Sequence, residues 1–330
     1  MANFLVINTS FFGDTLLTGP LCQNIKLAYP DAKVIFIVNK PFYEAAKYMK
    51  DVDEVIAYDK KKVHKGLGGA WRFYRENKQK LKGSIEASFV IYGNERGIVL
   101  SKLFGAKKVY ADNQGLIRVL LDNGRMDYGS YTKAQDRHSQ LLSCYTGKPV
   151  QELPMRYEPP QSASETVDCL LEANGIHPEM DFVAICTTTK KIEKDMKLDQ
   201  CIKLIDGLKE MKKLPILVGA GKIAKEYAEK LKEQGAKSFV DLTDKTSLAE
   251  LGAVLKRAST LVSVDTGTLH LGLSVGTPVV AVFYLNSAAH IGTWAPKSFY
   301  RHRLMADGDF SAEKMLEDVK ALAEEMNARD

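Results

Sequence analysis

The chain has 330 residues and a mass of 36.7 kDa, a length that predicts about two domains. Apolar residues make up 45% and charged residues 26%, a soluble globular composition that excludes wholesale disorder. The net charge of +5 favours anionic ligands or surfaces, and five dispersed cysteines without a C-x-x-C pair argue against a disulfide framework or a zinc site.

Strand-like and helix-like segments alternate through the first third of the chain. Runs typical of buried strands lie at residues 3–8, 33–38, 53–58, 87–92 and 107–110. Segments with helical periodicity lie between them at 15–27, 41–49, 65–82 and 96–104. This alternation predicts parallel βαβ units whose strands are covered on both faces.

A proline-rich stretch at 146–164 interrupts the alternation. Prolines in it break both the helical and the strand pattern, and they occur at Pro149, Pro154, Pro159 and Pro160. We interpret the stretch as a linker, which predicts an N-terminal domain at 1–160 and a C-terminal domain at 161–330.

The second half resumes the alternation. Strands are predicted at 181–186, 215–218, 238–242, 261–264 and 278–283, and helices at 199–212, 223–234, 247–258, 268–275 and 311–327. The last helix is amphipathic, and its apolar face could pack back on the N-terminal domain. The sequence thus predicts an α/β protein with two Rossmann-like, doubly wound parallel-sheet domains facing a central cleft. Ligands bind beyond the carboxyl ends of strands in such sheets, so we expect the functional site in that cleft.

The chain carries no sign of membrane insertion or secretion. No apolar run approaches the roughly 18–20 residues that span a bilayer. The N-terminus has no basic region before an apolar segment and no small-residue cleavage site. We therefore expect a cytoplasmic protein.

Asp14 is the first candidate for chemistry. It follows Gly13, between the first strand and the first helix, where Gly13 suits a tight turn and Asp14 a helix N-cap. A carboxylate there could instead act as a general base that takes a proton from an attacking hydroxyl. The spacing leaves capping and catalysis about equally open.

A second candidate lies where the strand at 261–264 meets the next helix. Backbone N–H groups and the helix dipole suit a diphosphate there, and hydroxyl and imidazole groups could assist. The residues are Asp265, Thr266, Gly267, Thr268 and His270. Helix capping and a core histidine are the alternative, but this many polar groups at one junction favour the phosphate site.

A third candidate follows the strand at 181–186, where hydroxyl and ammonium groups gather. Thr188 and Thr189 precede Lys190, Lys191 and Lys194, and both kinds of group suit phosphate oxygens. A solvated lysine-rich loop is the alternative. The sequence does not decide which lysine binds.

Two weaker signals complete the set. Gly219 and Gly221 form a G-x-G-x-x-A turn with Asp241 20 residues after Gly221, the outline of a dinucleotide fingerprint. Close packing of a strand–helix turn explains it at least as well. A basic run in the first domain is interpreted as a solvated loop, with contact to an acidic acceptor as the alternative; it comprises Lys60, Lys61, Lys62, His64 and Lys65.

Two blocks resemble a known family. FLVINTSFFGDTLLTGPLCQNIKLAYPDAKVIFIV, near the N-terminus, and VDLTDKTSLAELGAVLKRASTLVSVDTGTLHLGLSVGTPVVAVF, in the second half, are similar to the lipopolysaccharide heptosyltransferases of glycosyltransferase family 9. The resemblance implies a GT-B fold, with an acceptor domain first and a donor domain second. It implies inverting transfer of a heptose from an ADP-activated donor to a lipopolysaccharide inner-core acceptor, with no cofactor and no essential metal.

The resemblance also implies roles for the candidate residues. Asp14 matches the catalytic base. The matches for diphosphate, nucleotide and sugar binding are Thr188, Thr189, Lys194, Asp265, Thr266, Gly267 and His270, with Lys190 or Lys191 as alternatives to Lys194. Gly219 and Thr268 join the predicted donor-binding set from their positions at strand ends, not from the resemblance. The chain departs from the family where Gly221-Lys222 replaces a ribose-binding acid, and where Met196-Lys197-Leu198 replaces an aromatic-proline pair. A UDP or GDP donor is therefore kept as an alternative.

The implied partners are a nucleotide sugar and an anionic glycolipid, with peripheral contact at the inner face of the cytoplasmic membrane as an option. No nucleic acid is expected, because no basic helix, zinc-finger spacing or RNP-type motif occurs. Two lower-ranked alternatives remain: an NAD-dependent oxidoreductase that uses the G-x-G-x-x-A turn, and a non-catalytic nucleotide-sugar binder.

Overall fold

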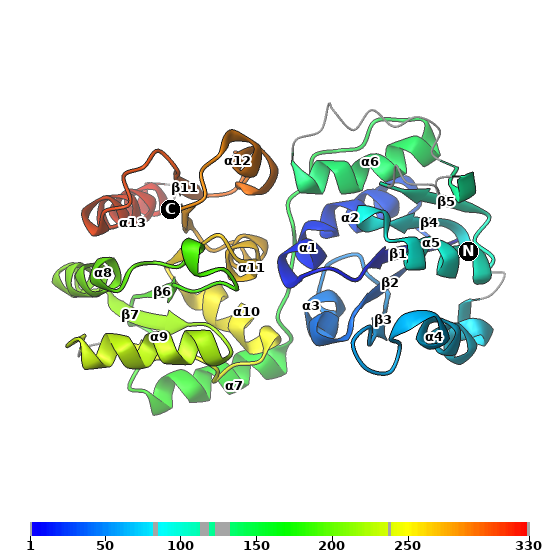
Figure 1. The fold of residues 1–330 in the computed structure, drawn as a ribbon. Helices are drawn as coiled ribbons and strands as arrows, with labels where there is room; N and C mark the ends of the chain where they lie inside the picture. The colour runs from blue at the N-terminus through cyan, green and yellow to red at the C-terminus, as the bar shows by residue number, and fades with distance from the viewer. Residues whose placement is uncertain (1, 82–84, 113–118, 123–132, 237–238, 329–330) are drawn as a thin grey trace. The chain divides into compact units, whose positions relative to one another are not determined.

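The computed structural model describes residues 2–81, 85–112, 119–122, 133–236 and 239–328. Lys82 and Ser238, at the ends of a predicted helix and a predicted strand, lie outside these residues. The chain divides into two compact units, Met1–Arg156 and Tyr157–Asp330. Each unit is built around a parallel sheet (Figure 1).

The first unit has a five-stranded sheet in the order β3-β2-β1-β4-β5, with every pairing parallel. The strands are β1 (Asn3–Asn8), β2 (Lys33–Asn39), β3 (Glu54–Tyr58), β4 (Ile85–Val90) and β5 (Lys108–Ala111). The helices are α1 (Phe12–Leu17), α2 (Gly19–Ala28), α3 (Tyr43–Lys47), α4 (Gly66–Leu81), α5 (Glu95–Leu103) and α6 (Ala134–Thr146), with single 3-10 turns η1 (Lys40–Phe42) and η2 (Ile91–Gly93).

Alternation along β1 explains why the first sheet needs helices on both faces. Ile7 and Leu5 lie in one core cluster with Phe73 of α4. Phe4 points the other way, where its ring meets that of Tyr145 of α6 at 5.7 Å. Both faces of the strand are therefore apolar, as the continuous run predicts.

The second unit has a six-stranded parallel sheet in the order β11-β10-β9-β6-β7-β8. The strands are β6 (Phe182–Cys186), β7 (Leu214–Val218), β8 (Val240–Asp241), β9 (Thr260–Val264), β10 (Val279–Val282) and β11 (His302–Met305). The helices are α7 (Gln161–Ala173), α8 (Leu198–Glu210), α9 (Lys222–Glu233), α10 (Leu248–Arg257), α11 (Gly267–Val275), α12 (Ala288–Trp294) and α13 (Ala312–Asn327), and η4 (Ile192–Lys194) is a 3-10 turn.

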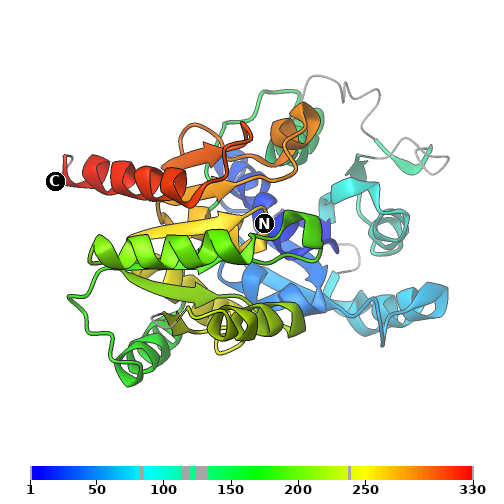
Figure 2. The ribbon, with the colours of Figure 1, turned by 60° about the vertical axis from the view of Figure 1, so that its left-hand side comes forward.

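The C-terminal helix packs within its own unit. Met315, Val319 and Leu322 of α13 are buried in one core cluster with residues of β9, β10 and α8. Figure 2 shows α13 (red) running alongside α8 (green). The apolar face of α13 is thus covered by the second unit.

The strand order reverses once in each unit. β1 and β4 are neighbours in the first sheet, and β6 and β9 are neighbours in the second. Such a reversal leaves a crevice beyond the carboxyl ends of the two strands, because their following helices cover opposite faces. A functional site is therefore expected in the four segments that follow β1, β4, β6 and β9.

The predicted α/β architecture of two parallel-sheet domains is confirmed, with local differences. The helix predicted at 15–27 is two helices, α1 and α2, because Pro20 in the first turn of α2 clashes with a continuous helix. Helix α7 begins at Gln161, inside the predicted linker, since prolines are tolerated just before a first helical turn. The elements α6, α7, α12 and β11 were not predicted.

Candidate functional site

Asp14 lies in the first turn of α1, directly beyond β1. It is the third helical residue and not the N-cap, and its Oδ2 accepts a hydrogen bond from the Phe11 backbone N–H at 3.1 Å. Gly13 is an ordinary helical residue with negative φ, so the predicted tight turn is wrong. The helix starts earlier than its apolar periodicity indicates, because a carboxylate at the third helical position accepts a hydrogen bond from the N–H of the N-cap residue.

Side chains of β1 and α1 hold the backbone of Asp14 in place. The Asn8 Nδ2 donates to the Asp14 carbonyl oxygen and to the Thr18 Oγ1, both at 3.0 Å. The Thr18 hydroxyl donates to the same carbonyl oxygen at 2.8 Å. All three residues are buried, so α1 is fixed on the end of β1.

Tyr92 supplies the other partner of the Asp14 carboxylate. Its hydroxyl donates to Asp14 Oδ1 at 2.8 Å. Tyr92 follows β4 and has φ of +56°, a left-handed conformation uncommon for a residue with a side chain. Its ring meets His138 of α6 edge-on at 5.2 Å. The carboxyl ends of β1 and β4 thus supply two residues in direct contact.

Burial dominates the electrostatics of Asp14, whose exposed fraction is 7%. Burial raises the pKa of its carboxyl, and the hydrogen bonds from Tyr92 and Phe11 oppose the rise only in part. A carboxylate with raised proton affinity, held by two donors at the end of a parallel strand, is suited to accept a proton from a hydroxyl.

In the second unit, the segment after β6 is folded by its own hydrogen bonds. The Thr189 N–H donates to Asp195 Oδ1 at 2.6 Å, and the Thr189 hydroxyl donates to the Lys191 carbonyl at 2.8 Å. The Met196 N–H returns to the Thr187 carbonyl at 2.9 Å. These bonds close a compact loop that ends in η4.

The three lysines of this loop differ in position. Lys194 is 14% exposed and pairs with Asp265, which follows β9. Lys190 and Lys191 are exposed and line a different hollow, a cavity of about 850 Å³ that also contacts Tyr227 of α9. Lys194 is therefore the lysine that lies beside the polar junction after β9.

Asp265 accepts from two groups at once. Its Oδ2 contacts Lys194 Nζ and lies 2.7 Å from His290 Nε2, and the Lys194 Nζ and His290 Nε2 atoms are 3.3 Å apart. Burial disfavours the charged carboxyl, but the hydrogen bonds from Lys194 and His290 outweigh burial and hold the pKa of Asp265 below its ordinary value. His290 comes from α12, which was not predicted, and His290 itself was not among the candidates.

The first turn of α11 lies next to Asp265. Thr266 is the N-cap in an extended conformation, and among the described residues its side chain makes no capping hydrogen bond. Gly267 and Thr268 begin the helix, so N–H groups at this end have no intrahelical acceptor. Free N–H groups and the positive end of the helix dipole make a site for an anionic oxygen.

His270 is buried one turn into α11. Burial lowers the pKa of its ring to about 4, so it is neutral at pH 7. Its Nδ1 atom is buried without a hydrogen-bond partner among the described residues. His270 therefore offers an unsatisfied polar atom, not a positive charge, to this junction.

The glycine turn after β7 has a conformational explanation. Gly219 has φ of +155° and a Cβ there would lie 3.1 Å from the Ala224 Cβ, while Gly221 has φ of +86°. The Gly221 N–H donates to Asp244 Oδ1 at 3.1 Å. Asp241 pairs with Lys232 at 2.6 Å. These contacts account for the G-x-G-x-x-A pattern as a tight strand–helix turn, and a contact of Gly219 with nucleotide stays a prediction.

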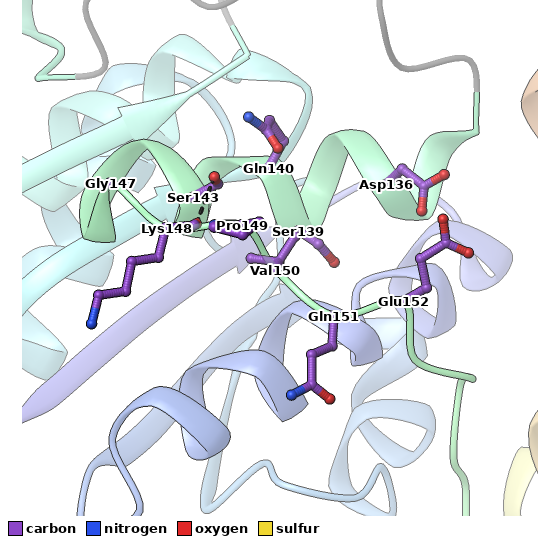
Figure 3. A pocket seen from close by; sticks show the side chains of 10 residues that line it. All are labelled: Asp136, Ser139, Gln140, Ser143, Gly147, Lys148, Pro149, Val150, Gln151 and Glu152. Carbon is purple, nitrogen blue, oxygen red and sulfur yellow. Dashed lines mark hydrogen bonds between the residues drawn. The ribbon is translucent and has the colours of Figure 1, made fainter.

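Another hollow lies in the first unit. A cavity of about 430 Å³ runs between α6 and the residues that follow it (Figure 3). Asp136 and Glu152 point toward each other at one end, and the Ser143 hydroxyl donates to the Lys148 carbonyl at 2.7 Å. None of the predicted site residues lines this cavity.

Two general features of the described ranges bear on ligands. No group of three or more histidine, cysteine, aspartate or glutamate residues within them is placed to hold a metal ion. No helix in the same ranges is long and apolar enough to cross a bilayer.

Two doubly wound units with parallel sheets, each with polar residues beyond the strands where its order reverses, match the GT-B fold of solved heptosyltransferase structures. The model of glycosyltransferase family 9 (heptosyltransferase) matches residues 81–318, and the chain belongs to this family. It is therefore a glycosyltransferase, and the G-x-G-x-x-A turn does not mark an oxidoreductase.

Solved structures support the same fold. A glycosyl transferase family 9 protein from Veillonella parvula is 19% identical, with a TM-score of 0.88 over 98% of each chain. The E. coli ADP-heptose lps heptosyltransferase II is 17% identical, with a TM-score of 0.82 over 99% of this chain and 100% of that one. The E. coli heptosyltransferase WaaC with ADP is 17% identical, with a TM-score of 0.73 over 97% and 100%. None of the curated proteins compared with this chain matches it in sequence.

Proposed function

We propose that this enzyme transfers a heptose or a related sugar from an ADP-activated donor to an anionic inner-core glycolipid, with inversion and without an essential metal. The observation that carries the proposal is the buried Asp14 carboxylate, with raised pKa, beyond β1. Fold likeness to WaaC, whose structure is described with ADP, supports an ADP donor. The acceptor would bind the first unit in the cytoplasm, at the inner membrane face.

The second unit supplies groups for a departing diphosphate. Lys194 and the N–H groups of Gly267 and Thr268 would stabilise the negative charge that develops on the leaving oxygen. The hydroxyls of Thr188, Thr189 and Thr266 would donate to the same oxygens. A lysine and a helix N-terminus supply the positive charge that a metal ion supplies in other transferases.

The first unit supplies the base. Asp14 would take the proton of the acceptor hydroxyl as its oxygen attacks the anomeric carbon. The bond from that carbon to the diphosphate oxygen breaks, and ADP leaves with the electron pair. Attack opposite the leaving group inverts the anomeric configuration.

A nucleotide panel and a variant test the proposal. ADP and ADP-heptose should raise the melting temperature selectively against UDP, GDP and NADH, because a ligand of the native state stabilises it. Asp14→Asn should lower the rate of sugar transfer to a lipopolysaccharide core acceptor by about 10²–10⁴-fold and leave the ADP shift intact. EDTA should leave transfer unchanged.

The control is Asp31→Asn, an exposed carboxylate of the same unit, which should keep the wild-type rate. An Asp14→Asn variant with the full rate would disprove the mechanism. Selective stabilisation by UDP or GDP would mean that the donor carries that nucleotide and not ADP. Binding without transfer to any acceptor would indicate a nucleotide-sugar binder.

A further inference from the structure

We propose that α4 and the loop before it form a docking surface for an anionic membrane. We call this surface, residues 60–80, the basic face. The proposal deepens the proposed function, which has the first unit bind its acceptor at a membrane face. Its evidence is separate, namely the charge, exposure and packing of this segment.

The positive charge of the whole chain is concentrated in the basic face. This segment has eight lysines and arginines against one acid, Glu76, for a net charge of +7, whereas the chain carries +5, so the remaining residues sum to −2. The cations are Lys60, Lys61, Lys62, Lys65, Arg72, Arg75, Lys78 and Lys80. A cluster of this density is attracted to anionic lipid headgroups.

Large apolar side chains stand exposed among these cations. Leu67 is 89% exposed, Trp71 is 53% exposed and Val63 is 40% exposed. Leu67, Trp71, Arg75 and Lys78 follow one another at spacings of four, four and three residues. Residues spaced in this way lie on the same side of a helix, so the four form one stripe along α4. A stripe of leucine, tryptophan and cations is typical of helices that lie in the membrane interface.

The opposite side of α4 holds the helix on the protein. Phe73 and Leu81 are fully buried, and the Phe73 ring packs edge-on against Tyr58 at 4.8 Å. The exposed stripe is therefore not the face that the fold needs for its core. Figure 1 shows α4 at the edge of its unit, beside β3.

The loop before α4 is fixed to the helix, so both present one surface. The His64 Nε2 lies 3.0 Å from Glu76 Oε2, and the Asp59 N–H donates to His64 Nδ1 at 3.0 Å. A Cβ on Gly69 would lie 2.1 Å from the His64 carbonyl carbon, so only glycine permits this approach. Lys61, Lys62 and Lys65 of the loop thus share a rigid support with α4.

The cations of the stripe are available to a ligand. Arg72 is paired with Glu76 at 2.8 Å, but Arg75 and Lys78 have no carboxylate partner among the residues that the structure describes. A surface hollow of about 610 Å³ lies beside Trp71 and is lined by Gly68, Trp71, Arg72, Arg75, Glu76 and Lys78. The two arginines suit the phosphate of a lipid headgroup, and the indole suits the boundary between the glycerol and the acyl chains.

Vesicle binding by the full chain tests the proposal. We expect at least about tenfold stronger partitioning to vesicles of phosphatidylcholine with about 30 mol% phosphatidylglycerol than to phosphatidylcholine alone. Arg75→Glu with Lys78→Glu should lower this partitioning by about tenfold or more. The charge-matched control is Lys203→Glu with Lys209→Glu on α8, both exposed, which should stay within about twofold of wild type.

The contribution of the apolar side chains to vesicle binding is tested separately, with its own control. Leu67→Ala and Trp71→Ala should each weaken vesicle binding, whereas Leu27→Ala, which truncates a leucine that is 54% exposed in the same unit, should not. The chain has two tryptophans, so Trp294→Phe leaves Trp71 as the sole fluorophore. Its emission should shift to the blue on vesicles and be quenched by brominated lipids.

Several results would overturn the proposal. These are equal binding to neutral vesicles, no loss in the Arg75/Lys78 variant, or vesicle binding without quenching of Trp71. If Trp294→Phe fails to fold, the quenching lost from wild type to Trp71→Phe gives the same answer. Binding of soluble polyglutamate without vesicle binding would indicate an acidic polypeptide instead. The vesicles contain no donor or acceptor, so their result is separate from the transfer reaction.

Discussion

Two opposing effects act on the charge of Asp14. Hydrogen-bond donors favour the charged carboxylate, and burial disfavours it. Tyr92 and Phe11 donate to separate oxygens of the carboxyl, yet its pKa is raised because burial is the larger effect. The proton affinity of the proposed base therefore depends on a tyrosine in the turn that follows β4. Tyr92 acts in this proposal as a positioning residue.

Replacing Tyr92 with phenylalanine should raise the pKa of Asp14 further, because it removes a hydrogen bond to the carboxylate. In the proposed mechanism the ionised form of Asp14 is the base, so the acidic limb of the pH profile of kcat/KM for transfer should move to higher pH. The measurement is a pH–rate profile. Tyr110→Phe, in β5, is the control and should leave the limb in place. A limb that stays or moves to lower pH in Tyr92→Phe would show that Tyr92 does not tune Asp14.

Two of the buried histidines, His138 and His270, should make stability depend on pH. Burial lowers the pKa of His138 and of His270 from 6.5 to about 4. The unfolded chain therefore binds protons that the folded chain does not, and unfolding free energy should fall as pH drops from 6.5 toward 4. At pH 5 each histidine should cost about 2 kcal/mol.

Urea unfolding at pH 7 and pH 5 measures this loss. His138→Gln should reduce the difference between the two pH values by about 2 kcal/mol. His177→Gln, at an exposed position, should not change the difference. An unchanged difference in His138→Gln would mean that the ring is protonated in the folded state.

Candidate residues next to a strand end could be found from sequence, but their partners could not. Asp265 directly follows an apolar run, and Asp14 lies six residues after the end of one, so both lie near the carboxyl end of a strand. Tyr92 contacts Asp14 only because β4 lies beside β1, and strand order cannot be read from local pattern. His290 reaches Asp265 from a short helix 25 residues later. No local signal links either pair.

At the scale of elements, strands with continuous apolar runs were predicted within a few residues. The unpredicted elements lack that pattern. Helix α6 buries Gln135, His138 and Ser139, so its inner face does not look apolar. Strand β11 is an edge strand with the sequence HRLM and only Met305 fully buried. Tertiary contacts, and not periodicity, place these elements.

Gly97 lets α5 approach the sheet where β1 and β4 adjoin. An alanine Cβ there would lie 2.8 Å from Val90 Cγ1 and 3.2 Å from Ile7 Cγ2. Both neighbours are branched and fully buried, so Gly97→Ala should lower the unfolding free energy by about 1–3 kcal/mol. Calorimetry or urea unfolding measures the effect.

The matched control is Gly68→Ala, at an exposed position of α4. Nothing lies within 4 Å of its Cβ position, so alanine should stabilise the helix by about 0.5–1 kcal/mol. If both substitutions changed stability in the same direction, helix propensity and not close packing would decide the effect at Gly97.

At the scale of the whole molecule, the two units repeat one plan. In each, the first strand of the unit lies centrally, the second and third follow on one side, and the fourth begins the other side. Each unit also has its own buried core cluster. The family model covers residues 81–156 of the first unit and all but the last residues of the second, so the match draws on both units.

Nucleotide should leave a footprint in the second unit. With ADP, amide hydrogen exchange should slow at residues 187–199, 265–275 and 288–294, because the proposed diphosphate orders the Lys194 loop, the first turn of α11 and α12. Residues 9–17 should exchange as before. Mass spectrometry of peptides measures both, and protection confined to the first unit would contradict a donor site in the second.

The ion pair between Asp265 and Lys194 has a kinetic consequence. Under the proposed function, an arriving diphosphate must draw Lys194 away from Asp265, with His290 left to hold the carboxylate. After transfer, Asp265 competes with the spent nucleotide for the same ammonium group. In this proposal the carboxylate would compete with ADP for Lys194, which would shorten the residence time of ADP and also weaken its initial binding.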